Sequence, residues 1–156
     1  MNQKGYALVE VIVVVLLSSI IGSYVIVGTD FLEELRFKTL ISEVERGIRQ
    51  AQRRAVATGK IMQVYCTKEK IYIREGWKVA DYTIAIDKGI ILPTKDAQGN
   101  AVSGKVIYFN GSMRPSKSGT ITLIHEKLKK QARITVRVAT GKTTVYFEPY
   151  KKRGGA

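Results

Sequence analysis

The fold of this chain is decided by one apolar stretch, YALVEVIVVVLLSSIIGSYVIVG at residues 6–28. A helix that crosses a membrane needs roughly 20 consecutive apolar residues. The stretch supplies 23 residues, and Glu10 is the only charged side chain among them. The sequence therefore predicts a transmembrane helix at 6–28.

Glu10 is unusual because a charge inside hydrocarbon costs about 2.5–3.5 kcal/mol, so it is expected to have a partner or a function. One interpretation is that Glu10 lies near the cytoplasmic end of the helix and reaches water. The other is that cleavage after Gly5 creates a positive amine at Tyr6, which neutralises the carboxylate.

The short cationic leader, MNQKG at residues 1–5, does not resemble a secretory signal, whose apolar core has 7–15 residues and is followed by a small-residue cleavage site. Cleavage before the apolar stretch would leave that stretch attached. Lys4 on one side and the acidic residues on the other predict that the leader faces the cytoplasm and the remainder lies outside it. These acidic residues are Asp30, Glu33 and Glu34.

The order of Gly5, Tyr6, Glu10 and a long apolar stretch resembles the class III leader of type IV pilins and pseudopilins. This resemblance implies that a prepilin peptidase cuts after Gly5 and that Tyr6 becomes a methylated N-terminus. It also implies that Glu10 pairs with the Tyr6 amine of a neighbouring subunit. Tyr6 departs from the phenylalanine or methionine usual in the family. The implied partners are other pilin or pseudopilin subunits, the prepilin peptidase and an inner-membrane assembly platform.

After the apolar stretch, apolar residues recur at steps of three and four and predict an amphipathic helix that stops at Gly59. These residues are Phe37, Ile41, Val44, Ile48, Ala51 and Ala55. From residue 60 the period changes to two, which predicts strands. The expected fold class is α+β, with a long N-terminal helix whose first half spans the membrane and a β-rich antiparallel head. The expected domains are leader 1–5, transmembrane or filament-core helix 6–28, amphipathic extension 29–59 and basic globular head 60–156.

The alternation predicts strands within the head and a loop at 93–104. The predicted strands are 61–66, 70–75, 82–86, 89–92, 105–109, 119–124, 133–139 and 143–148. The motifs SGTITL at 118–123 and TGK at 140–142 resemble the last strands of minor pilins. That class includes the H-type pseudopilins of type II secretion, the FimT-like proteins and the D-type competence pseudopilins.

Charge is concentrated in the head, where residues 60–156 hold nineteen lysines and arginines against seven acidic residues. Such a field attracts polyanions and weakens as salt rises. Solvated loop residues are one interpretation of the basic clusters, and non-specific DNA or polyanion contact, with Tyr146 and Tyr150 near enough to stack on bases, is the other. The candidate contact residues are Lys127, Lys129, Lys130, Arg133, Lys142, Lys151, Lys152 and Arg153.

The remaining composition argues against an enzyme, a metal site or a cofactor. His125 is the only histidine and is expected to face solvent at the end of a strand, and common catalytic motifs are missing from the sequence. Cys66 has no second cysteine to pair with and is expected to be buried. Core or inter-subunit packing is the expected role of most of the aromatic residues near the strands. They are Trp77, Tyr65, Tyr72, Tyr82 and Tyr108.

The expected function is that of a minor pilin-like subunit, assembled into a type IV pilus-like filament or into a secretion or competence pseudopilus. DNA binding and uptake is the specific expectation for the basic head. The expected location is the cytoplasmic membrane, crossed once, with the head outside the cytoplasm in a surface or envelope filament. The alternative is a membrane-anchored module that binds anionic envelope polymers and never polymerises.

Overall fold

The computed structural model describes residues 3–93, 106–111, 115 and 119–150, and the side chains of this part except at residues 3–6, 8 and 21–28. The chain divides into two compact units, Met1–Arg36 and Phe37–Ala156. Helix α1 is Gln3–Thr58. The strands are β1 Met62–Cys66, β2 Lys70–Glu75, β3 Tyr82–Ala85, β4 Ile90–Ile91, β5 Val106–Phe109, β6 Gly119–His125, β7 Lys130–Val136 and β8 Thr143–Pro149.

The first unit corrects the prediction of a membrane-spanning helix. Within the described residues, no helix combines the length and the apolar character that crossing a membrane requires. The predicted fold class with its membrane-spanning first half, the transmembrane helix at 6–28 and the single-pass location in the cytoplasmic membrane are therefore wrong.

In the second unit, the part of α1 from residue 37 onward packs with antiparallel sheets through one apolar face. All six residues that the three-and-four spacing picks out are buried, and Ile48, Ala51 and Ala55 have no exposed surface. Gly59 takes a left-handed conformation with φ of 68°, which glycine adopts without steric cost. The helix therefore ends where the sequence predicts.

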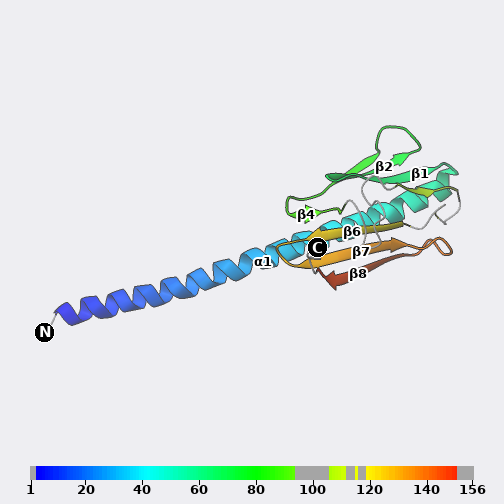
Figure 1. Cartoon of the computed structure of the whole chain (residues 1–156). Helices are drawn as coiled ribbons and strands as arrows, with labels where there is room; N and C mark the ends of the chain where they lie inside the picture. The colour runs from blue at the N-terminus through cyan, green and yellow to red at the C-terminus, as the bar shows by residue number, and fades with distance from the viewer. Residues whose placement is uncertain (1–2, 94–105, 112–114, 116–118, 151–156) are drawn as a thin grey trace. The chain divides into compact units, whose positions relative to one another are not determined.

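The strands form two four-stranded sheets, which Figure 1 shows beside the last part of α1. Sheet A has the order β3-β2-β1-β5 and sheet B the order β4-β6-β7-β8. Both sheets are antiparallel throughout. Seven predicted strand ranges agree with the structure within one residue at each end.

The range predicted at 133–139 is wrong, because β7 begins three residues earlier at Lys130. A tight turn at residues 126–129 makes this possible: the Lys129 N–H donates to the Glu126 carbonyl at 3.1 Å. Lys129 also takes a positive φ of 50°. Lys130 and Arg133 therefore lie in a strand rather than in a loop, and residues 137–142 form the next turn.

The core of the second unit joins α1 to both sheets in one cluster. Gly47 lies where α1 packs closely against sheet A, since an added Cβ would come within 2.5 Å of the Ile73 Cδ1 atom. Cys66 is fully buried, as predicted. The prediction of a solvent-facing His125 is wrong: the side chain is buried, with its ring edge-on to Phe37 at a centroid distance of 5.7 Å.

Candidate functional site

The N-terminal apolar segment, defined here as residues 9–20, contains the longest run of consecutive exposed large apolar side chains among the described residues. Its large apolar side chains are all between 47% and 62% exposed. They are Val9, Val11, Ile12, Val13, Val14, Val15, Leu16, Leu17 and Ile20. Seven of these positions are consecutive, so the apolar surface extends around the whole helix rather than along one stripe.

Serines near the end of this segment are accommodated without interrupting the helix. The hydroxyl of Ser18 donates to the Val14 carbonyl at 2.7 Å, and that of Ser19 donates to the Val15 carbonyl at 2.8 Å. Since these bonds lie within the helix, they satisfy the hydroxyl donors without a partner from outside.

Glu10 is exposed on the same segment, between two apolar residues. Gly5 and Tyr6 lie in the helical backbone near the start of α1. Positions 6 and 10 are one turn apart and share a face of the helix. Cleavage after Gly5, methylation of Tyr6 and the pairing of Glu10 stay predictions.

The basic residues near β7 are divided between a turn and a strand, and their contact with DNA or another polyanion stays a prediction. Lys127 and Lys129 are exposed in the turn that precedes β7, and Lys130 is half-buried at its start. Arg133 lies on the outer face of sheet B, where its Nη2 is 2.7 Å from the Glu148 carboxylate. The charge of Arg133 is therefore largely offset.

Arg133 also occupies one face of the Tyr146 ring, so that face is not open for stacking on a base. The guanidinium carbon of Arg133 lies 5.4 Å from the centre of the Tyr146 ring, at cation–π distance. Tyr150 is held at the backbone, since its N–H donates to the Lys129 carbonyl at 2.8 Å.

Lys142 lies at the opposite end of the β7–β8 hairpin from Lys130. The length of β7 separates the two residues by roughly 20 Å, at about 3.3 Å per strand residue. It lines a pocket of about 200 Å³ together with Arg49, Gln52, Arg53, Thr140 and Gly141. Arg49 is paired with Glu45 at 2.6 Å, so Arg53 and Lys142 supply most of the net positive charge. The sequence does show Arg49 and Arg53 four residues apart on one helix face, but not that the 140–142 turn lies against them.

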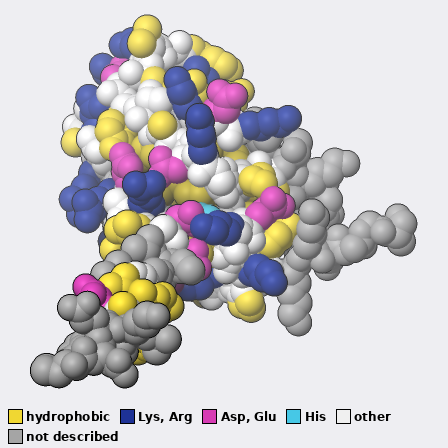
Figure 2. All heavy atoms as spheres, turned by 90° about the vertical axis from the view of Figure 1, so that its left-hand side faces the viewer, with side chains coloured by type: hydrophobic (Ala, Val, Ile, Leu, Met, Phe, Trp, Pro, Cys, Tyr) yellow, Lys and Arg dark blue, Asp and Glu magenta, His cyan; other side chains and the backbone are white. Residues whose placement is uncertain are grey.

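On the face drawn in Figure 2, lysines and arginines are spread over the second unit with carboxylates among them. Lys151, Lys152 and Arg153 lie outside the described residues. Within the described residues, no group of three histidine, cysteine, aspartate or glutamate side chains is placed to hold a metal ion.

The exposed apolar helix is thus the feature that most needs a partner.

The prediction that the chain belongs with pilins, type II secretion or competence proteins gains no support from comparison with known proteins. Comparison with protein-family models, with curated proteins and with solved structures finds no match to this chain.

Proposed function

We propose that this chain is a self-assembling subunit of pilin-like kind, in which the N-terminal apolar segment packs against the same segment of neighbouring copies. The observation that supports the proposal is the run of exposed apolar side chains on every side of α1 at residues 11–17. A helix that is apolar all round is stable when it is buried. Burial contributes roughly 25 cal/mol for each Å² of apolar surface removed from water, which favours association.

Glu10 gives the proposed packing its register. A carboxylate buried without a partner is strongly destabilising, so copies pack only where Glu10 meets a positive group. Cleavage after Gly5 would provide that group as the amine of Tyr6. The mass of the chain isolated from its own cells would then lack residues 1–5, and an intact N-terminus would remove this source of charge.

The assembly itself is tested with the full chain by sedimentation velocity and electron microscopy. The parent chain is expected to form elongated particles. Val13→Lys combined with Leu17→Lys adds two charges on one face of the segment and is expected to give a monomer. A control that adds the same two charges at exposed positions of the second unit, Gln50→Lys with Thr83→Lys, is expected to assemble like the parent.

Two results would reject the proposal. One is a parent chain that remains monomeric at all concentrations tested. The other is a Val13→Lys/Leu17→Lys chain that assembles as well as the control, because the apolar segment would then not be the contact surface.

A further inference from the structure

The outer face of sheet A carries three tyrosines that the proposed assembly does not use. Tyr65 on β1 lies opposite Tyr72 on β2, and their rings are stacked with centroids 6.3 Å apart and an angle of 28° between them. Tyr108 on β5 lies opposite Gln63 on β1. All three tyrosines are half-buried, so each keeps part of its surface open to solvent.

Arg74 ties this face to the only tryptophan of the chain. Its guanidinium carbon lies 5.3 Å from the centre of the Tyr65 ring and 5.2 Å from the centre of the Trp77 ring. Its Nε donates to the Gln63 side-chain oxygen at 3.2 Å. The aromatic face, defined as Tyr65, Tyr72, Tyr108, Arg74 and Trp77, therefore combines π surfaces with a cation held among them.

Trp77 is presented by the turn at residues 76–81 and is 82% exposed. Two backbone hydrogen bonds hold this turn where it leaves and rejoins the sheet. The Gly76 N–H donates to the Ile61 carbonyl at 2.8 Å, and the Asp81 N–H donates to the Ile73 carbonyl at 2.9 Å. Because the backbone is held at both ends, less conformational entropy is lost when Trp77 meets a ligand.

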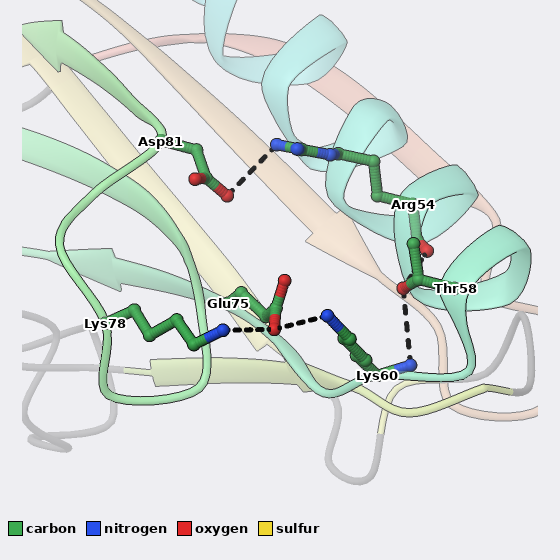
Figure 3. Close-up of polar contacts among 6 residues, drawn as sticks. All are labelled: Arg54, Thr58, Lys60, Glu75, Lys78 and Asp81. Carbon is green, nitrogen blue, oxygen red and sulfur yellow. Dashed lines mark hydrogen bonds and ion pairs between the residues drawn. The ribbon is translucent and has the colours of Figure 1, made fainter.

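Ion pairs fix the same turn and offset its negative charge, as Figure 3 shows. The Glu75 carboxylate lies 2.9 Å from the Lys78 ammonium and 3.0 Å from the Lys60 ammonium. Asp81 lies 3.0 Å from Arg54 of α1. The carboxylates of Glu75 and Asp81 are thus paired, which reduces their repulsion of an anion that approaches Arg74.

The described residues on the outer face of sheet B form a different pattern. There the cross-strand pairs include Thr120 with Thr135 and Thr122 with Arg133. The arginine-on-ring contact found there among the described residues, Arg133 over Tyr146, includes a guanidinium already paired with Glu148. Sheet B therefore provides a natural control for the aromatic face.

We propose that the aromatic face of sheet A binds single-stranded nucleic acid without sequence preference. Bases stack on the ring of Tyr72 and on those faces of the Tyr65 and Trp77 rings that Arg74 leaves open, and Arg74 contacts the phosphate backbone. Residues 60–156 hold nineteen basic against seven acidic residues, which favours a polyanion. The rings favour a single strand, because only unpaired bases expose π surfaces for stacking.

Trp77 makes the test direct, because fluorescence of the sole tryptophan reports contact at this face. The full chain is titrated with a short oligothymidylate, with the corresponding duplex and with inorganic polyphosphate. The expected result is quenching by the single strand, weakened by added salt, and little quenching by the other two. Absence of quenching by the single strand, or equal quenching by polyphosphate, would overturn the proposal.

Variants locate the site through the anisotropy of a labelled oligothymidylate. Trp77→Ala and Tyr72→Ala are each expected to weaken binding by about tenfold, as loss of one stacking ring does. Tyr72→Phe keeps the ring and is expected to retain binding. Because Trp77 is exposed, Trp77→Ala leaves the core intact even if Tyr72→Ala disturbs sheet A.

The matched control is Tyr146→Ala, which removes the ring beneath an arginine on sheet B. It is expected to bind like the parent chain. Equal losses in Tyr146→Ala and Trp77→Ala would place binding elsewhere and reject the aromatic face as the site.

Discussion

The side-chain Nε2 of Gln52 on α1 donates a hydrogen bond to the carbonyl oxygen of Gly141, 2.7 Å away, although the two residues are 89 positions apart. Gly141 is buried, and its positive φ of 65° forms the tight turn between β7 and β8. The bond therefore fastens sheet B to the helix at the end of the hairpin.

Gln52→Ala removes the side-chain N–H that donates this hydrogen bond to the Gly141 carbonyl. The expected loss in the free energy of unfolding is about 0.5–1.5 kcal/mol, the range for a typical intramolecular hydrogen bond, because this bond is only partly buried. Denaturant unfolding measures the change. Gln50→Ala on the exposed side of α1 is the control and is expected to unfold like the parent chain.

Ile48→Ala tests the packing of α1 between the sheets. Ile48 has no exposed surface, and truncating a buried isoleucine to alanine typically costs 2–5 kcal/mol. Denaturant unfolding is expected to show a loss in that range. Val56→Ala, at a position that is 40% exposed, is expected to cost much less, and equal losses would contradict the packing described.

Glu75 predicts a change of stability in acid. Hydrogen bonds from Lys78 and Lys60 hold the pKa of its carboxyl below the ordinary value of 4.5. Because the pKa of Glu75 is lower in the folded than in the unfolded chain, its ionised carboxylate stabilises the fold at pH values above the unfolded pKa. This stability is lost as the pH falls through the folded pKa. The parent chain should therefore exceed Glu75→Gln in stability at neutral pH, and the difference should vanish in acid. A difference that does not change with pH would contradict the ion pairs.

Tyr82 predicts the opposite dependence, in alkali. Its hydroxyl donates to the Glu43 carboxylate of α1, which raises the pKa of Tyr82 above 10.0. The hydrogen bond from the Tyr82 hydroxyl stabilises the fold at pH values below the unfolded pKa of Tyr82. This stability is lost as the pH rises through the folded pKa. Thermal unfolding of the parent chain and of Tyr82→Phe should differ at neutral pH and converge above pH 10. A difference that persists at high pH would exclude this hydrogen bond as its source.

Local patterns in the sequence predicted the second unit well where one side of an element is buried. The three-and-four spacing identified the buried face of α1, and the alternation in Ile71 and Ile73 identified β2. The start of β7 was missed because it depends on the positive φ of Lys129, which lysine seldom adopts. The membrane span at 6–28 was predicted from the length of an apolar stretch, and it is wrong because no helix in the described part of the chain combines the length and apolar character that a span requires.

The candidate surfaces were harder to predict because each depends on strand register or on contacts distant in the sequence. Tyr65 and Tyr72 are stacked only because β1 and β2 pair in the observed register. The pocket that contains Lys142 exists because the 140–142 turn meets α1. His125 is buried because Phe37 packs against its ring, which its position at the end of a strand does not indicate.

Thiol accessibility at position 16 tests the proposed assembly most directly. Leu16 is 59% exposed, and the native Cys66 is buried and contributes little background. Full-length chain carrying Leu16→Cys is labelled with a maleimide at concentrations that span assembly, with exposed Lys68→Cys as the control. Self-assembly through the apolar segment predicts that labelling of residue 16 slows as concentration rises while labelling of residue 68 stays fast. Equally fast labelling of both residues in assembled particles would contradict it.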